Sequence, residues 1–168
     1  MTPAGPQGFV PDAQNGRLLR DAFGRFATGV TLVTAAGPEG CTAITANSFS
    51  SISMEPPLIM WAPARASARF ATFAAAEHFA VHVLARDQAD LAWAVARNRD
   101  ALDHHPLQRN DQGVPVLDRC LARFDCATHA LHEAGDHMIV LGRVLRAQLS
   151  DGEPLAFFGG QIAGITRG

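Results

Sequence analysis

The sequence predicts a mainly β protein, a closed or split antiparallel β-barrel with helices at its periphery. Short segments rich in β-branched and aromatic residues recur along the chain and are joined mostly by turns. Helical patterns are few, so the regular strand–helix alternation of a doubly wound parallel sheet is missing. With 168 residues, 48% of them hydrophobic, the chain is long enough to bury one core. Closing the sheet into a barrel would also cover its strand edges.

The first third predicts one helix and a β-hairpin. Apolar residues at helical spacing predict a helix over residues 15–28 that ends at Gly29. A β-branched strand follows at 30–34, and a Gly-Pro turn at 37–40 leads into a strand over 41–50. The apolar face of the helix consists of Leu18, Leu19, Ala22, Phe23 and Phe26.

The remaining two thirds predict further strands and two short helices. A helix over 67–76 has Ser67 as its N-cap, and an alanine-rich helix covers 87–97. The polar stretch 98–119 is interpreted as a loop or a weak helix. Strands are predicted at 58–61, 79–84, 124–131, 138–149, 157–158 and 162–165.

Domain organisation and compartment follow from composition. Residues 1–14 predict a flexible tail, and residues 15–168 a single domain. The tail lacks the pattern of a signal peptide, and no apolar run approaches the roughly 18–20 residues of a membrane span. The three cysteines, Cys41, Cys120 and Cys126, form no C-x-x-C pair and no disulfide framework. We therefore expect a cytoplasmic protein.

Charge excludes several function classes. The net charge of −2 offers no basic field for nucleic acid or a membrane surface. All 14 basic residues are arginine, so no lysine is available for a Schiff base or a P-loop. Of the seven histidines, His129 and His132 would face opposite sides of a strand, and ligand spacing predicts no metal site.

One polar segment indicates a binding site. Residues 42–53 contain an unusual number of small hydroxyl and amide side chains: Thr42, Thr45, Asn47, Ser48, Ser50, Ser51 and Ser53. Such groups suit a planar ligand with many donors and acceptors, for example a flavin and its phosphate. An ordinary strand followed by a Ser-rich loop explains the same residues equally well.

Several ordered segments between Leu18 and Ile165 carry a family resemblance. They are 26–34, 42–53 with 56–58, 79–84 with Gln88 and Leu91, 135–137 with Gly142 and Val144, and 154–155 with 157–160. In this order they resemble the flavin reductase family, the small reductase partners of two-component flavin monooxygenases.

The resemblance implies an FMN-binding split barrel that holds FMN or FAD between the subunits of a homodimer. By position it places Gly29, Val30 and Thr31 near the flavin and Thr45, Ala46, Asn47 and Ser48 along the isoalloxazine. It implies a phosphate site formed by Ser51, Arg65 and Ser67, where an arginine can bind phosphate through two hydrogen bonds. The matching histidine, His137, would be catalytic, lying over the flavin near the nicotinamide. A surface arginine and a histidine in a turn are the plainer interpretations of Arg65 and His137.

The implied activity is hydride transfer from NADH or NADPH to FMN or FAD, with reduced flavin passing to a separate oxygenase. Such a reaction needs two rings held together and no acid–base pair. The alternatives are a flavin-storage protein without NAD(P)H turnover and a self-contained FMN enzyme that reduces a small organic acceptor. The chain departs from the family pattern at His82, often Asn, and at Ile162, often Tyr. Residues 90–95 also lack a usual phenylalanine.

Overall fold

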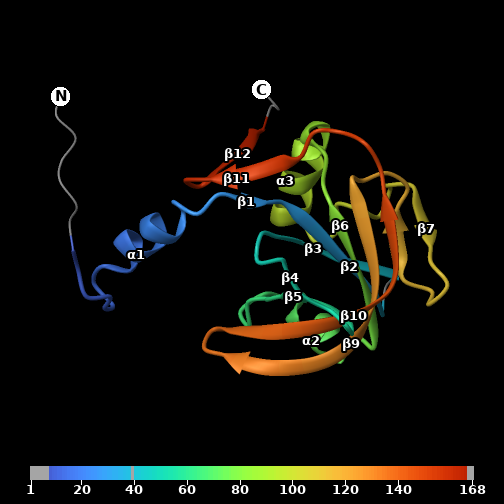
Figure 1. The fold of residues 1–168 in the computed structure, drawn as a ribbon, viewed down its shortest axis with the longest axis horizontal. Helices are drawn as coiled ribbons and strands as arrows, with labels where there is room; N and C mark the ends of the chain where they lie inside the picture. Colours follow the sequence, from blue (N-terminus) through green and yellow to red (C-terminus); the bar gives the residue numbers. More distant parts are fainter. Residues whose placement is uncertain (1–7, 39, 166–168) are drawn as a thin grey trace.

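The computed structural model describes residues 8–38 and 40–165, and β-strands dominate it (Figure 1). The strands are β1 (Thr28–Gly29), β2 (Thr31–Gly37), β3 (Gly40–Ala46), β4 (Ser50–Met54), β5 (Pro57–Trp61), β6 (His78–Val83), β7 (Leu107–Arg109), β8 (Pro115–Leu117), β9 (Ala122–Ala134), β10 (His137–Leu149), β11 (Leu155–Phe158) and β12 (Gln161–Gly164). The helices are α1 (Gly16–Phe23), α2 (Phe70–Ala75), the short 3-10 helix η1 (Arg86–Gln88) and α3 (Ala89–Arg97). The prediction of a mainly β protein with peripheral helices is confirmed.

A seven-stranded sheet forms the body of the protein. Its order is β3-β2-β6-β9-β10-β5-β4, and every neighbouring pair is antiparallel. The two edge strands, β3 and β4, do not pair with each other within residues 8–38 and 40–165, so the sheet is open rather than closed. A smaller sheet, β1-β11-β12, lies beside the open edge near α1 (Figure 1).

The predicted single strand over 41–50 is wrong: the chain forms two strands that lie at opposite edges of the sheet. Residues 47–49 make the corner between β3 and β4. Phe49 stacks on Phe124 of β9 with ring centroids 5.7 Å apart, and the Ser48 hydroxyl accepts a hydrogen bond from the Ala62 amide at 2.9 Å. These contacts with distant residues fix the change of chain direction at residues 47–49, and the local sequence pattern does not reveal them.

Two other segments also differ from the prediction. The stretch 98–119, expected to be a loop or weak helix, contains the β7–β8 ribbon, whose β8 residues are buried. The helix expected over 67–76 begins only at Phe70 because residue 67 lies in a preceding turn, where the Ser67 hydroxyl accepts from the Arg69 amide at 3.2 Å. The N-terminal tail predicted for residues 1–14 lies partly outside the described residues, as does Glu39 of the predicted turn.

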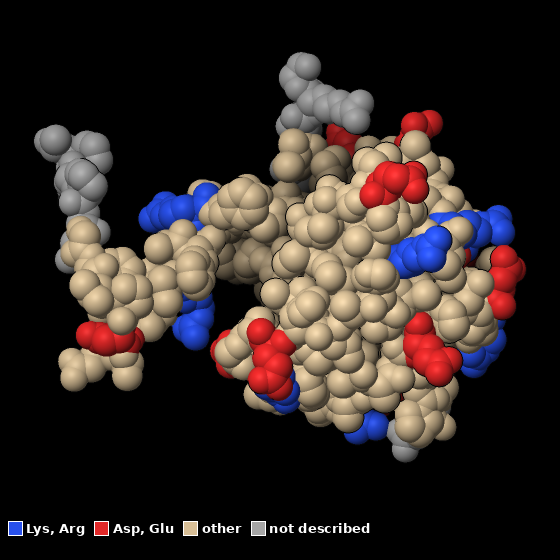
Figure 2. Space-filling view, turned by 60° about the horizontal axis from the view of Figure 1, so that its bottom comes forward, with Lys and Arg blue, Asp and Glu red and all other residues tan. Residues whose placement is uncertain are grey.

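Helix α1 stands apart from the body of the protein (Figures 1 and 2). It ends at Phe23, with Gly24 as its C-cap, and not near Gly29, which lies in β1. The Gly159 amide donates to the Gly24 carbonyl at 2.9 Å and ties the end of the helix to the smaller sheet. None of the helix residues is buried, so its apolar face is not covered by residues 8–38 and 40–165.

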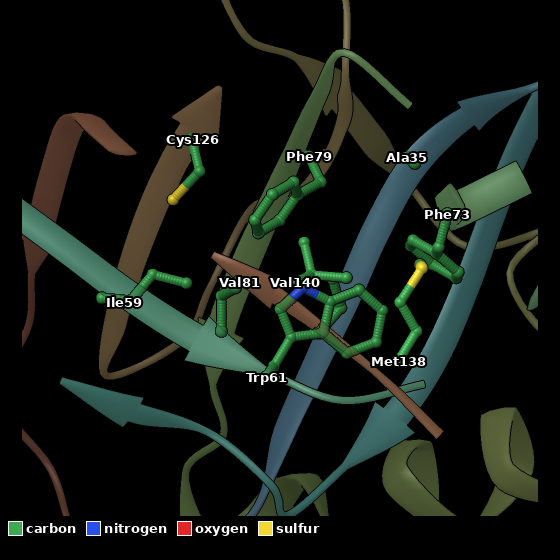
Figure 3. Close-up of a cluster of buried hydrophobic side chains, with 10 residues drawn as sticks. Ala35, Ile59, Trp61, Phe73, Phe79, Val81, Cys126, Met138 and Val140 are labelled. Atoms are coloured by element: carbon green, nitrogen blue, oxygen red, sulfur yellow. The ribbon is translucent and has the colours of Figure 1, made fainter. Parts of the chain in front are cut away.

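The main hydrophobic core surrounds Trp61 and is built from side chains of β2, β5, β6, β9, β10 and α2 (Figure 3). The Trp61 ring contacts Phe73 of α2 edge to face at 4.9 Å and lies 6.0 Å from Phe79 of β6. A second core cluster packs α3 against β2, β3 and β11 through residues such as Leu32, Ala92 and Leu155.

A group of buried polar residues joins β6, β8 and β9. Arg123 and Asp125 form an ion pair, with Arg123 Nε 3.0 Å from Asp125 Oδ1, and both side chains are almost fully buried. Opposite Arg123 in the register, His82 is completely buried; its Nδ1 donates to the Leu32 carbonyl at 2.9 Å. Its Nε2 accepts from the Leu117 amide at 3.2 Å, so both ring nitrogens are used by a neutral imidazole.

The surface shows no concentration of one charge on the face drawn in Figure 2, and the cysteines are free, as the small net charge and the cysteine spacing predict. Acidic and arginine side chains are interspersed on the face drawn in Figure 2. The three cysteines carry thiols, and burial raises the pKa of Cys41 to about 11 and of Cys126 to about 12. Among the described residues, no helix is long and apolar enough to cross a membrane.

Candidate functional site

The first group of predicted site residues lies where β2 begins and β3 ends. Thr31 pairs with Ala46 in the register, and its hydroxyl donates to the Ala46 carbonyl at 2.7 Å. The Thr45 hydroxyl donates to the Ala92 carbonyl of α3 at 2.7 Å. Both threonines therefore hold the scaffold together: one joins the two strands, and the other fixes the helix to β3.

Two hollows flank this strand end. One, of about 520 Å³, lies between the α1 segment and the smaller sheet; the other, of about 180 Å³, lies between β3, α3 and β11–β12. Asn47 and Phe157 line both hollows, which makes them adjoining parts of one site that we call the trough. Binding pockets for small molecules usually measure about 300–1,000 Å³, so the larger hollow alone has a suitable volume.

Several features of the trough favour an added ligand. A Cβ built at Gly29 would meet no atom within 4 Å, so the backbone there is open to close approach. The Thr28 hydroxyl is buried, and the Asn47 side chain is exposed; neither has a hydrogen-bond partner within residues 8–38 and 40–165. Val30 is buried beneath the smaller hollow.

A second group of predicted residues meets around the segment after β5. Ala64 forms a β-bridge with His137, and the Arg65 amide donates to the Asp136 carbonyl at 2.9 Å. The Ser67 amide donates to the Ala64 carbonyl at 3.0 Å. These contacts bring Arg65, Ser67 and His137 together although they are distant in sequence. Ser48 is the link between the two groups, because its hydroxyl bonds the backbone of Ala62.

His137 is oriented by its neighbour. Its Nδ1 lies 2.8 Å from Asp136 Oδ1, and a carboxylate can only accept, so Nδ1 carries the proton. The hydrogen bond and the charge of His137 hold the pKa of Asp136 below its usual range. The side chain is 43% exposed, and no hydrogen bond from residues 8–38 or 40–165 uses Nε2, which can therefore bind a ligand.

Arg65 and Ser51 are less clearly placed for phosphate. The Arg65 guanidinium donates to Glu133 at 3.0 Å and lies 5.4 Å above the Phe70 ring. Exposed ion pairs of this kind are worth only about 0–1 kcal/mol, so a phosphate can displace Glu133. Ser51 is exposed on the edge strand β4, and no contact among the described residues joins its side chain to Arg65 or Ser67.

Most residues that line the trough are not among the predicted site residues: Thr28, Trp93 and Phe157 are examples, and Ile162 was singled out only as a departure from the family pattern. Phe157 and Phe158 look alike in the sequence, yet strand alternation sends Phe157 into the trough and Phe158 outward. Alternation was a usable signal for this pair. Trp93 gave no such signal, because its position depends on how α3 docks on β3.

The trough thus combines a larger hollow beside α1 with a smaller hollow lined mainly by apolar side chains. Residues 23–166 match the family described as flavin reductase like domain. The FMN reductase (NADH) SmoA of Agrobacterium fabrum is 50% identical over 95% of this chain and 91% of its own length. The stachydrine N-demethylase reductase subunit Stc3 of Rhizobium meliloti is 40% identical over 79% of this chain, which spans 59% of that longer protein.

Solved structures agree with these sequence relatives. The NADH:FAD oxidoreductase SgcE6 of Streptomyces globisporus superposes with a TM-score of 0.88 at 33% identity, covering 98% of this chain and 96% of that one. The chain belongs to the flavin reductase family, a family of oxidoreductases, as the ordered segments of the sequence predicted.

Proposed function

We propose that this chain catalyses hydride transfer from NADH to FMN or FAD and supplies the reduced flavin to a separate oxygenase. The observation that carries the proposal is the trough at Asn47 and Phe157, open beside a strand end in a chain of this family. The names of the relatives described above, which pair NADH with FMN or with FAD, support the donor. The reductase-subunit relative supports a partner oxygenase.

The residues present fit a flavin. Gly29 leaves room for close approach, and Thr28 and Asn47 offer polar atoms that no residue of the described chain uses. Ala46 and Ser48 flank Asn47 at the corner after β3, where backbone groups can reach the pyrimidine edge of the ring. When bound, the flavin supplies the hydride acceptor. The protein has to hold two rings in contact, which requires no acid–base pair.

His137 has the role of orienting the nicotinamide donor. Its proton on Nδ1 is held by Asp136, and the exposed Nε2 can bind a carboxamide or a phosphate of NADH. Arg65 and Ser67 are held beside His137 by the Ala64 bridge. Together with Ser51 they form the end of the site that binds the flavin phosphate. Arg65 reaches the phosphate by leaving Glu133.

A homodimer completes the proposal. The open sheet then corresponds to a split barrel, and α1, none of whose residues is buried by the described part of the chain, provides apolar surface for a second copy. Phe23 and Phe26 are 70% and 77% exposed, and both line the larger hollow of the trough. A second copy packed on this segment would close the flavin site.

The test is steady-state NADH oxidation by the purified full chain with and without added FMN or FAD. We expect a rate that rises and saturates with added flavin. His137→Ala is expected to raise the KM for NADH about tenfold while leaving flavin affinity within twofold. His129→Ala, a substitution at an exposed histidine of β9, is the matched control and should change neither constant.

Two outcomes would overturn the proposal in different ways. Tight flavin binding without oxidation of NADH or NADPH would make the chain a flavin-storage protein. Reduction of an organic acceptor at full rate without any added flavin would make it a self-contained FMN enzyme.

A further inference from the structure

The smaller hollow of the trough has almost entirely apolar walls. Trp93 and Ala96 of α3 form one wall and Phe157 and Ile162 of the β11–β12 hairpin another. Val30 and Ala46 close the inner end. The alanines of α3 leave the space that larger side chains would fill.

The hollow offers few polar groups to a ligand. The Thr45 hydroxyl donates to the Ala92 carbonyl at 2.7 Å, and among the described lining side chains this leaves the Asn47 amide at the rim and the Trp93 indole N–H as donors. A carboxamide or an adenine buried here would leave several of its donors and acceptors unpaired, which is unfavourable. The hollow therefore favours a ring edge that carries no polar atoms.

The volume matches one substituted benzene ring. The hollow measures about 180 Å³, and an apolar cavity of about 150 Å³ in another protein binds benzene. An isoalloxazine has one such edge, the dimethylbenzene ring, opposite its polar pyrimidine edge.

Trp93 is held in place from two sides. The Arg97 guanidinium lies 5.1 Å from the centre of its ring, on the same helix one turn later. The bond from Thr45 to Ala92 fixes the neighbouring turn of α3 to β3. The indole thus forms a positioned aromatic wall, with Phe157 of the hairpin lining the same hollow.

We propose that the hollow between Trp93, Phe157 and Ile162 receives the dimethylbenzene edge of the flavin, and that Trp93 determines how strongly its two methyl groups are recognised. The polar half of the ring then lies on the Asn47 side. This inference rests on the proposed flavin binding and adds the orientation of the ring.

The experiment compares the affinity of FMN with that of 7,8-didemethyl-FMN, which lacks the two methyl groups. Each of the two methyl groups, only partly buried in this open hollow, should contribute about a threefold change in affinity, so wild type should prefer FMN about tenfold. Trp93→Ala and Phe157→Ala should reduce this preference to threefold or less. Phe158→Ala, the matched control on the outward face of the same strand, should retain the tenfold preference.

A spectroscopic measurement complements the affinities. The chain has two tryptophans and no tyrosine, so Trp61→Phe leaves Trp93 as the single indole. Bound FMN should quench most of the Trp93 fluorescence in this variant. Weak quenching at saturating FMN would contradict the proposed contact.

The outcomes separate this inference from the proposed function. If wild type binds no flavin, the proposed function itself fails. If flavin binds but the tenfold preference is missing or survives in both trough variants, the methyl groups lie elsewhere and only this inference fails. If Trp93→Ala raises the KM for NADH and leaves the preference intact, the hollow receives the nicotinamide instead.

Discussion

The aromatic residues of the core and those of the α1 segment lie in similar amphipathic sequence patterns, but the former are buried and the latter are exposed. Phe73 is 2% exposed against Trp61 in the main hydrophobic core, whereas Phe26 is 77% exposed after α1. Both belong to segments whose apolar residues recur at helical spacing. An amphipathic pattern predicts that the apolar face of a helix is covered, but it does not predict which segment covers it.

The difference separates the region that is stabilised by contacts within the subunit from the α1 segment, whose apolar face needs a further partner to be covered. Isolated helices shorter than about 12–15 residues are marginal in water, and α1 has eight residues without a buried one. Within the described residues, the backbone bond from the Gly159 amide to the Gly24 carbonyl ties the end of α1 to the body, and β1, which follows the helix, pairs with β11. We therefore expect the core to determine the stability of the subunit and the α1 segment to determine its association.

The largest expected effect comes from truncating the same residue type in the two regions. Phe73→Ala should lower the free energy of unfolding by about 3–5 kcal/mol, because it empties space beside Trp61. Phe26→Ala should change it by less than about 0.5 kcal/mol in the dissociated subunit. Urea unfolding at low protein concentration measures both. Equal losses would mean that the two regions do not differ.

Two glycines allow the same comparison between the packed core and the open trough. A Cβ at Gly142 would lie 2.5 Å from the Phe79 ring and 3.2 Å from Cys126, so Gly142→Ala should cost about 1–3 kcal/mol of unfolding free energy. Gly29→Ala adds a Cβ that has no atom of the described residues within 4 Å, so it should leave the free energy of unfolding unchanged while weakening flavin binding. Thermal unfolding and flavin titration together check this pair; an unfolding loss at Gly29 would contradict the open trough.

The buried polar group predicts how stability depends on pH. Burial, aided by the charge of Arg123, lowers the pKa of His82 to about 4 from 6.5. As pH falls, His82 takes up a proton in the unfolded chain before it does so in the folded one. Its contribution to the free energy of unfolding is therefore fully present above pH 6.5 and is lost as pH falls toward 4. Between pH 7 and 5 it should lower the unfolding free energy by about 2 kcal/mol.

The measurement is urea unfolding at both pH values. His82→Asn should reduce the loss on going from pH 7 to 5 by that amount, whereas His129→Asn, at an exposed position of the same sheet, should not. An unchanged slope in His82→Asn would mean that another group causes the loss.

The smallest expected effect concerns the exposed aromatic pair. Phe23→Ser combined with Phe26→Ser should weaken self-association about tenfold or more, as expected when a proposed apolar contact is lost. Leu149→Ser, at an exposed apolar residue of β10, serves as control. Sedimentation over a dilution series gives the dissociation constants. Unaltered association of the double variant would remove α1 from the proposed interface.

Much of the molecule was predictable because its information is local. Segments rich in β-branched residues marked most strands, Gly37 and Gly40 marked the β2–β3 hairpin, and Gly135 and Asp136 marked the turn between β9 and β10. The resemblance of the ordered segments determined the family, which the comparisons confirmed. The absence of lysine by itself excluded reactions that need a Schiff-base or P-loop lysine.

Long-range contacts decided the rest. The split of 41–50 into β3 and β4 depends on Phe49 stacking on Phe124, and the meeting of Arg65 with His137 depends on the bridge through Ala64. The entry of Trp93 into the trough depends on the bond from Thr45 to the α3 backbone. Periodicity determines which face of an element is apolar, but only packing between distant segments determines what that face meets. The sequence by itself therefore determined most of the elements and the family, and the tertiary structure decided where some elements end and which side chains share one site.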